Sequence, residues 1–428
     1  MTCGPMVHAW EDPAVCPTGF GNYSGLEFTT HIGPYPGLFY FSDLSLRFVG
    51  GLVAAPFIEY CDSVPNLAFL NSTAYPVVRG VADFYASYAT RDSNGTYHIP
   101  FGCAQEICGP ANVDENDSTP DLALARMVLA AAVRYAAVLQ RDAAKVGLWQ
   151  KVLSGLASYA TTTAQDGSNR TIFAEGRAMA PGQGIPWSGN ARYPVDYFAP
   201  MHPAGQVGLT APPDLLRVAR DTVDAINAVN KWHPTNGLCM AWPPATRVAN
   251  SSRAAALLDH FEAALSATLQ RNLYPSLGGG GIEQVGGTLA VNELMLQSFE
   301  GFLRFFPAWP PGERGGFRSL RALGGVLVDA DVDAGGTVAN VVLQATVAAN
   351  VTLLAPASFG AGAPLLRCGA GKAAAAPGGG SAAAPGASFS PCGTAPGESG
   401  GTLYCAPLAA GQRCEVLPAS GSNDVDEP

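Results

Sequence analysis

The spacing of apolar residues changes once along this chain, and this change constrains the fold more than any other feature. Between residues 75 and 298, apolar side chains recur every three or four positions, the period of an amphipathic helix. Beyond Gly301 the period falls toward two, as in Val326 and Val328 or Val341 and Leu343. The sequence therefore predicts a mainly helical domain over residues 1–300 and a small β module over residues 301–428.

The clearest predicted helix spans residues 120–141. Thr119 is its predicted N-cap, Pro120 takes the first helical position, and Asp121 lies at the positive end of the helix dipole. The same period predicts helices at residues 75–88, 143–160, 212–229, 252–273 and 289–298. Residues 1–62, rich in Gly, Pro, Phe and Tyr, are assigned to loops and short helices. Amphipathic helices joined by long connections are typical of a helical toroid.

Cysteines and glycosylation sequons indicate a secretory route. The chain has ten cysteines without the close pairs of a zinc site, so disulfides are predicted and no metal is expected. Seven Asn-x-Ser/Thr sequons begin at Asn22, Asn71, Asn94, Asn116, Asn169, Asn250 and Asn350. Because residues 1–11 contain no apolar signal segment, we expect the chain to be N-terminally truncated or its start to be misassigned.

Charge and composition exclude several partners and mark one flexible segment. The 34 acidic and 24 basic residues give a net charge of -10 without any basic run, which argues against nucleic acid and anionic membranes. The longest apolar stretches, near Val326 and over residues 338–351, are interrupted by Asp and Asn, so no membrane span is predicted. Residues 369–402, rich in Gly, Ala, Pro and Ser, are predicted to be flexible. Disulfides of four cysteines are expected to crosslink the surrounding β module: Cys368, Cys392, Cys405 and Cys414.

Two groups of sequence blocks resemble one enzyme family. Residues 278–288, Gly-Gly-Gly-Gly-Ile-Glu-Gln-Val-Gly-Gly-Thr, lead into Val-Asn-Glu-Leu-Met-Leu-Gln-Ser and then into residues 303–310, which end in Phe-Pro-Ala-Trp-Pro. Earlier, Tyr-Pro-Val-Val-Arg-Gly-Val-Ala at residues 75–82 precedes Ala-Gln-Glu-Ile at residues 104–107 and Asp-Leu-Ala-Leu-Ala-Arg at residues 121–126. Together these blocks resemble glycoside hydrolase family 95, the inverting α-L-fucosidases, from about residue 69 to residue 327. The resemblance implies an (α/α)6 toroid, a six-hairpin ring of helices, closed by a C-terminal β module.

The resemblance also implies two catalytic carboxylates. Inverting hydrolysis needs a protonated acid and an ionised base that are roughly 6.5 to 9.5 Å apart, so that a water fits between them. Glu106 matches the family's general acid, although an ordinary loop glutamate is the alternative. Glu283 is the candidate base, but Ile282 occupies the family's aspartate position, so a loop salt bridge or an inactive site is the alternative. The family's Asn-x-Asn pair, which positions the base and its water, is absent from this sequence.

Three further residues are candidates for contact with substrate. Gly280 and Gly281 would let the backbone approach a sugar closely. His202 lies in a loop where the resembled family places sugar-contacting residues, and a structural histidine is the alternative. Glu293 and Gln297, four positions apart, are interpreted as internal support of a helix. The sequence has neither a Gly-x-Ser-x-Gly elbow nor a Walker loop, so no cofactor is expected.

The resulting expectation is a secreted α-glycosidase that acts on terminal α-L-fucosides or α-L-galactosides of an oligosaccharide or polysaccharide. Two alternatives remain open. A toroid that has lost its base would bind carbohydrate without cleaving it, and a polysaccharide lyase would leave an unsaturated sugar. The sequence does not predict an oligomeric state.

Overall fold

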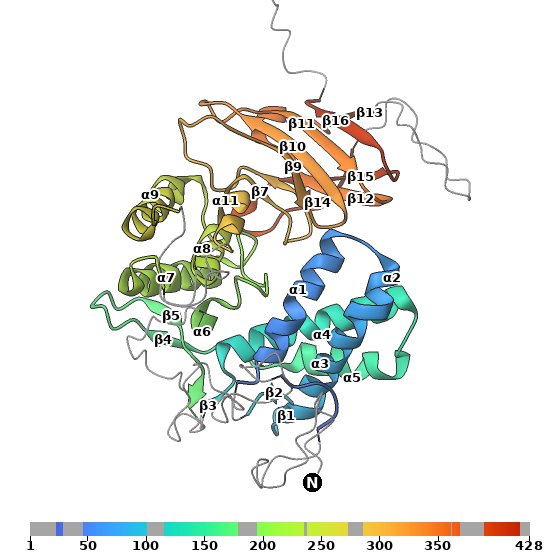
Figure 1. Ribbon diagram of the computed structural model, residues 1–428, viewed down its shortest axis with the longest axis vertical. Coiled ribbons are helices and arrows are strands. Elements are labelled where there is room, and N and C mark those ends of the chain that lie inside the picture. Colours follow the sequence, from blue (N-terminus) through green and yellow to red (C-terminus); the bar gives the residue numbers. More distant parts are fainter. Residues whose placement is uncertain are drawn as a thin grey trace, which may run out of the picture.

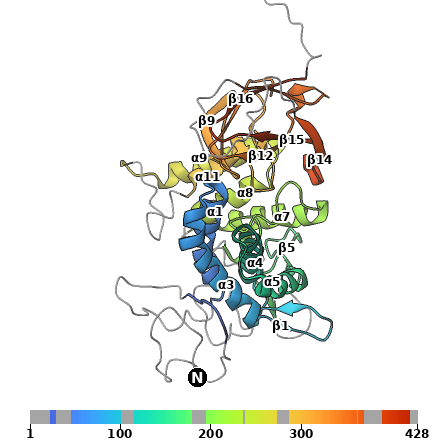
Figure 2. The same ribbon diagram turned by 90° about the vertical axis from the view of Figure 1, so that its right-hand side faces the viewer.

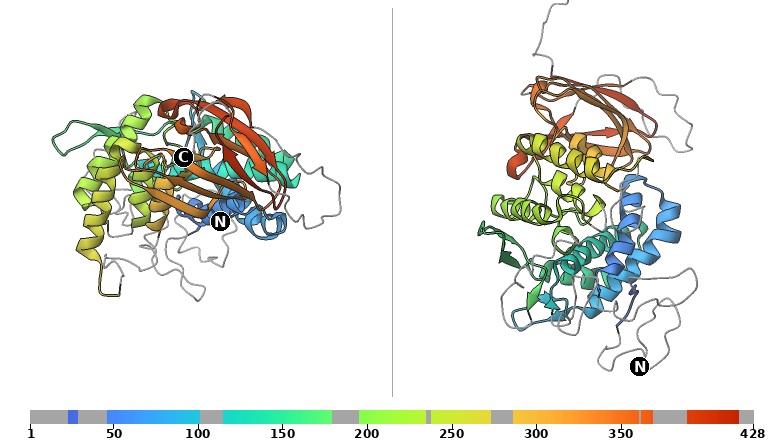
Figure 3. Two further views of the ribbon diagram at one scale, coloured as in Figure 1. Left: turned by 90° about the horizontal axis from the view of Figure 1, so that it is seen from above. Right: turned by 60° about the vertical axis from the view of Figure 1, so that its left-hand side comes forward.

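The helices and strands form two parts along the long axis of the molecule. The computed structural model describes residues 23–28, 46–100, 115–178, 195–234, 238–272, 286–360, 362–368 and 389–419. In Figure 1 a helical body lies below a β module made of the C-terminal strands. Figure 2 and the right-hand view of Figure 3 show the same two layers from other directions, and the left-hand view of Figure 3 looks down on them from above. The predicted order of a helical part followed by a β part is therefore confirmed.

Four long helices pack around one core in the first half of the helical body. They are α1 (Val49–Ser63), α3 (Tyr75–Tyr88), α4 (Thr119–Leu139) and α5 (Ala143–Gly155). A short helix α2 (Leu67–Phe69) and the π-helical turn η2 (Leu70–Ala74) join α1 to α3. Side chains from all four long helices bury one another, and α4 contacts the other three. The prediction of a helix over residues 75–88 is confirmed at both ends.

Helix α4 is long and apolar enough to cross a membrane, which the sequence analysis did not anticipate. Among the described residues it is the one helix that meets both criteria, and 56% of its most apolar window is buried inside the protein. Its contacts with α1, α3 and α5 are those of a core helix. The N-cap is Ser118, whose hydroxyl accepts a hydrogen bond from the Asp121 amide at 3.2 Å, so the prediction of Thr119 as N-cap is wrong by one position.

Helix α1 lies in the region that was predicted to hold loops and short helices. Gly50, Gly51 and Pro56 look like helix breakers in sequence, yet all three lie inside this 15-residue helix. Gly51 faces α4, and a methyl group added there would overlap the side chain of Leu124. The small residue thus lets the two helices approach closely. Tertiary packing outweighs the weak helix propensity of glycine at this position.

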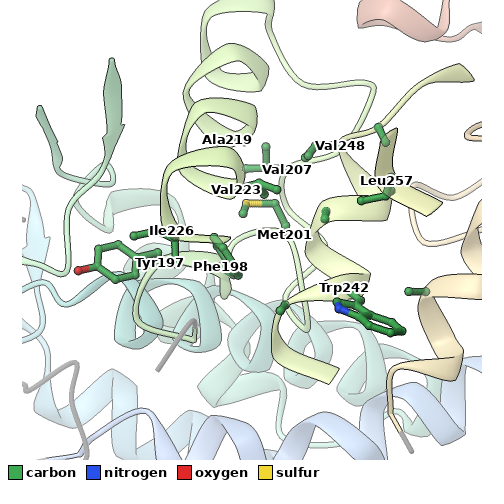
Figure 4. Close-up of a cluster of buried hydrophobic side chains, with 14 of the residues drawn as sticks. Tyr197, Phe198, Met201, Val207, Ala219, Val223, Ile226, Trp242, Val248 and Leu257 are labelled. Carbon is green, nitrogen blue, oxygen red and sulfur yellow. The ribbon is translucent and has the colours of Figure 1, made fainter. Parts of the chain in front are cut away.

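The second half of the helical body packs around a separate core, shown in Figure 4. Its helices are α6 (Val195–Phe198), α7 (Pro213–Asn230), α8 (Trp242–Arg247), α9 (Ser251–Thr268) and α11 (Thr288–Met295), with a 3-10 turn η3 (Leu238–Met240). Trp242 stacks on Phe261 with ring centroids 4.2 Å apart. Trp232 and Trp242 are both buried, so these two tryptophans are core residues.

The helical body also contains short two-stranded antiparallel sheets. They pair β1 (Thr90–Arg91) with β2 (Tyr97–His98), β3 (Glu115–Asn116) with β6 (Arg177–Ala178), and β4 (Thr161–Thr163) with β5 (Thr171–Phe173). The last pair is tied to α7 by a hydrogen bond of 2.9 Å from the Phe173 amide to the Thr222 hydroxyl. A six-hairpin ring needs twelve helices, whereas the described residues contain seven helices of eight or more residues. The helical body is thus established, and a closed ring stays a prediction.

The β module is a sandwich of two antiparallel sheets. One sheet has the order β13-β16-β11-β10-β9 and the other has the order β12-β15-β14. Their bounds are β9 (Gly315–Ala322), β10 (Val326–Val332), β11 (Val338–Ala345), β12 (Ala349–Leu354), β13 (Leu365–Cys368), β14 (Ser390–Thr394), β15 (Thr402–Leu408) and β16 (Arg413–Leu417), with 3-10 turns η4 (Ala357–Phe359) and η5 (Gly397–Ser399). The alternating residues predicted to face the core are all buried, among them Val328, Leu343 and Leu353.

Two disulfides hold the module together, as predicted. Cys368 is bonded to Cys414 across β13 and β16, and Cys392 is bonded to Cys405 across β14 and β15. Residues 369–402 were predicted to be flexible. Of these, residues 369–388 lie outside the described residues, and residues 389–402 include β14 and η5.

The helical body passes into the β module through a short hairpin. The helix predicted at residues 289–298 ends at Met295, because β7 (Leu296–Gln297) pairs with β8 (Arg304–Phe305). The predicted domain boundary between residues 300 and 301 falls inside this hairpin and stays a prediction.

Candidate functional site

Of the five residues predicted to act in catalysis or to contact substrate, the structure describes only His202. Glu106, Glu283, Gly280 and Gly281 all lie outside the described residues, so their predicted roles remain predictions. The candidate site can therefore be built from the surroundings of His202.

His202 lies on the wall of a cavity of about 570 Å³. The cavity lies where the two halves of the helical body meet the β module, because its walls come from α1, α4, α8, α11, the loop after α6 and strand β9. Its polar and aromatic lining residues include Glu59, Asp62, Arg126, Arg134, His202, Gln206, Arg247, Asn292, Glu293, Phe299 and Arg321. A volume of this size is within the usual range for small-molecule sites.

A buried ion pair forms one wall of the cavity. Arg247 of α8 donates from Nε to both carboxylate oxygens of Glu293 on α11, at 3.1 and 2.9 Å, and from Nη2 to Oε1 at 2.7 Å. Its Nη1 donates to the Met201 carbonyl at 2.9 Å, and its guanidinium lies 4.4 Å from the Phe299 ring centroid. Each partner is 7% exposed. The pair therefore fixes α8, α11 and the loop of His202 relative to one another.

His202 is a neutral, partly buried side chain. Burial lowers its pKa well below the usual value, and the positive charge of Arg247 lowers it further. The Nδ1 atom is shielded from solvent and has no hydrogen-bond partner among the described residues. A neutral imidazole with one free nitrogen can accept or donate one hydrogen bond, depending on its tautomer. Because Nδ1 is shielded, a ligand in the cavity could reach it only if the side chain changed its position.

Glu59 contributes a carboxyl group to the same cavity from α1. Although the residue keeps an exposed surface, the surrounding walls partly desolvate its carboxyl group, which raises its pKa. Arg247 lowers this pKa and the carboxylate of Glu293 raises it, so the net shift is upward. One helical turn later, Asp62 is held by Arg134 at 2.5 Å and by the Tyr135 hydroxyl at 2.8 Å. The cavity therefore combines a carboxyl group with a raised pKa and two carboxylates that are held by arginines.

A second, more open cleft of about 490 Å³ lies beside the β1–β2 hairpin. There His98 lies between two carboxylates, with Nδ1 2.7 Å from Asp117 Oδ2 and Nε2 3.4 Å from Asp92 Oδ2. Partial burial lowers the pKa of His98, but hydrogen bonds and charge from Asp117 and Asp92 raise it above the usual value. Asp117 is fully buried and also accepts from the Ile99 amide at 2.9 Å. Within the described ranges, no three His, Cys, Asp or Glu residues come together as a metal site.

The sequence analysis missed most of this site. Glu59, Arg247 and Glu293 are far apart in the chain and meet only through packing. The interpretation of Glu293 and Gln297 as helix support is wrong, because Glu293 pairs with Arg247 and Gln297 belongs to β7. One available signal was the presence of charged residues inside otherwise apolar helical patterns, since buried charges are usually paired.

Comparisons with known proteins do not identify a family for this chain. No protein-family model matches the sequence, and no curated protein matches it. Among solved structures it is similar to a kojibiose phosphorylase candidate from the human microbiome, with 7% identity and a TM-score of 0.36 over 71% of this chain and 47% of that one. It is also similar to an α-L-rhamnosidase from Streptomyces avermitilis in complex with L-rhamnose, with 14% identity and a TM-score of 0.32 over 86% of this chain and 32% of that one. The chain thus spans about half and about a third of these two proteins, and the resemblance to family 95 stays a prediction.

Proposed function

We propose that the chain is a secreted glycoside hydrolase that cleaves terminal α-L-fucosides or α-L-galactosides with inversion. In this proposal Glu106 protonates the leaving oxygen and Glu283 activates a water from the opposite face of the sugar. His202, Gly280 and Gly281 contact the substrate, and the helical body is part of an (α/α)6 toroid.

The observation that carries the proposal is the agreement between the family-like blocks and the elements around them. The block at residues 75–82 lies on α3, and the block at residues 121–126 lies on α4, so the segment with Glu106 connects two helices. The segment with Glu283 leads into α11, which is followed by β8 and the Phe-Pro-Ala-Trp-Pro sequence. The described elements thus follow the order that the resemblance implies: a helix before and after the segment with Glu106, and a helix and then strands after the segment with Glu283. Two disulfides in the β module are consistent with a secretory route.

The test is hydrolysis of oligosaccharides that end in an α-L-fucosyl or α-L-galactosyl residue by the full chain and three variants. Glu106→Gln removes only the transferable proton and is expected to abolish turnover of natural glycosides, and Glu283→Gln is expected to lower it by at least about a hundredfold. Glu262→Gln, at an exposed position of α9, is the matched control and should retain the wild-type rate. Proton NMR of the first product should show the inverted anomer. Unchanged rates in Glu106→Gln would rule out the proposed acid, and binding without turnover in the unmodified chain would favour a carbohydrate-binding protein.

A further inference from the structure

The cleft beside the β1–β2 hairpin has a glycosylation sequon in its wall. All three residues of the sequon, Asn94, Gly95 and Thr96, line this cleft of about 490 Å³. They form the turn of the hairpin, in which Asp92 Oδ1 accepts hydrogen bonds from the Asn94 and Thr96 amides at 2.9 and 2.8 Å. Asn94 is exposed. A sugar attached to its Nδ2 atom would therefore start at the wall of the cleft.

Two hydrogen-bond donors on the same wall have capacity that the protein does not use. Arg177 of β6 donates from Nη2 to the Ser158 carbonyl at 2.5 Å and to its Oγ at 3.2 Å, whereas Nη1 makes no hydrogen bond within the described part of the chain. Of the Arg177 nitrogens, only Nε is shielded from solvent without a partner. The His98 side chain is 28% exposed, and its Nε2 approaches Asp92 only at 3.4 Å. Arg177 Nη1 and His98 Nε2 can thus both donate to a ligand in the cleft.

The charges at the cleft are balanced. Behind the wall, the buried Asp117 carboxylate lies 2.7 Å from His98 Nδ1 and 3.4 Å from Arg177 Nε. Asp92 supplies a second carboxylate on the other side of the imidazole. Two basic side chains therefore face two acidic ones. A cleft with donors and no excess charge matches a neutral ligand rich in oxygen acceptors, and the hydroxyl and acetamido groups of N-linked core sugars supply such acceptors.

We infer that the glycan attached to Asn94 folds back into this cleft, where its first sugars accept hydrogen bonds from Arg177 and His98. The covalent link favours this occupant over a free sugar, because a tethered ligand binds at a high effective concentration. The hairpin already contacts the segment after α5 through a hydrogen bond of 2.9 Å from the Ala157 amide to the Tyr97 carbonyl. The glycan adds a second attachment, between the hairpin and β6. The inference rests on the secretory route in the proposed function and not on the glycosidase activity.

The experiment uses the full chain secreted from cultured mammalian cells, with peptide N-glycosidase as the probe. Mass spectrometry follows glycan release at Asn94 and at Asn169, an exposed sequon in the β4–β5 hairpin. Each rate in the folded protein is divided by the rate at the same site after denaturation. This ratio is expected to be at least about tenfold lower for Asn94 than for Asn169. Arg177→Lys removes Nη1 but keeps a positive charge beside Asp117, and it should raise the Asn94 ratio. Arg217→Gln, at an exposed position of α7, should change neither ratio.

A double-mutant cycle of thermal midpoints separates docking of the glycan from a local loss of structure. Arg177→Lys should lower the midpoint of the glycosylated chain by about 1–2 °C more than it lowers the midpoint of the Asn94→Gln chain. The reason is that only the first chain has a glycan contact to lose. If Arg177 had a purely structural role, the substitution would lower both midpoints equally.

Three outcomes overturn the inference. They are equal ratios at Asn94 and Asn169, an Arg177→Lys variant that changes neither the Asn94 ratio nor the midpoint difference, and an Asn94 without glycan in a chain whose other sequons are occupied. A chain without glycan at every sequon would contradict the inference together with the secretory route. Hydrolysis assays on the same preparations test the glycosidase proposal independently, so failure of one does not imitate failure of the other.

Discussion

Glu293 holds Arg247 through both of its carboxylate oxygens at the point where α11 contacts α8. Both side chains are buried, and the remaining guanidinium nitrogen is bound to the Met201 carbonyl. The pair thus connects three segments that are distant in sequence, and it does so next to the cavity that contains His202 and Glu59.

The first prediction concerns this pair. Glu293→Gln would leave the buried guanidinium without its counter-charge, which typically lowers the free energy of unfolding by about 3–5 kcal/mol. Urea denaturation followed by circular dichroism measures the change. Glu415→Gln is the matched control, since Glu415 forms an exposed pair with Arg367 at 3.6 Å and should change stability by less than about 1 kcal/mol. Equal stability of the two variants would contradict the structural role given to Glu293.

The second prediction concerns the pH dependence contributed by His98. Because the folded protein raises the pKa of His98, its contribution to stability is fully present below about pH 6.5 and is lost as the pH rises through the raised pKa. His98→Gln should therefore reduce stability by on the order of 1 kcal/mol at pH 5.5 and by less at pH 8.5. Denaturation midpoints at the two pH values give the difference. A variant that is equally destabilised at both would show that the charge of His98 is not involved.

The third prediction compares two glycines in helices of the same core. Gly51→Ala on α1 would push a methyl group into Leu124 of α4 and is expected to destabilise the protein by about 1–3 kcal/mol. Gly147→Ala on α5 meets no atom within 4 Å and should instead stabilise it by up to about 1 kcal/mol, because alanine favours the helix. Thermal unfolding of the two variants is the measurement. If both substitutions change the midpoint in the same direction, the close contact between α1 and α4 is not what the glycine provides.

These comparisons show which parts of the fold the sequence could reveal. Helix α3 was found at both ends because its apolar residues recur with a regular helical period. The strands were found because inward residues such as Val328 and Leu343 alternate with outward ones. Helix α1 was missed because Gly51 and Pro56 resemble breakers when the packing of α4 against them is unknown. A local pattern predicts an element only where the element does not depend on its neighbour.

The site was harder to predict than the fold for a similar physical reason. The environment of Glu59 includes Arg247 and Glu293, which are more than 180 positions away in the sequence. No periodicity in the chain relates these residues to each other. His202 was recognised only through the resemblance of its loop to a known family, and nothing in its neighbouring residues indicates that one ring nitrogen is left without a partner.

The fourth prediction concerns glycan attachment if the chain is produced through a secretory route. Asn71, Asn94, Asn169 and Asn350 are exposed and should carry glycans. Asn250 should not, because its Nδ2 atom, the site of attachment, donates to Glu398 Oε2 at 3.1 Å in a contact between the helical body and the β module. Mass spectrometry of peptides after enzymatic deglycosylation gives the occupancy of each sequon. Full occupancy of Asn250 in the folded protein would contradict this contact.

The bond between Cys368 and Cys414 has a consequence for proteolytic nicking. These cysteines are partners in the β13–β16 ladder and are 46 positions apart in the chain. A protease that cuts between residues 369 and 388 would divide the polypeptide, but both fragments would stay covalently joined through this bond. Such a nicked protein would migrate as one species in non-reducing electrophoresis and as two after reduction.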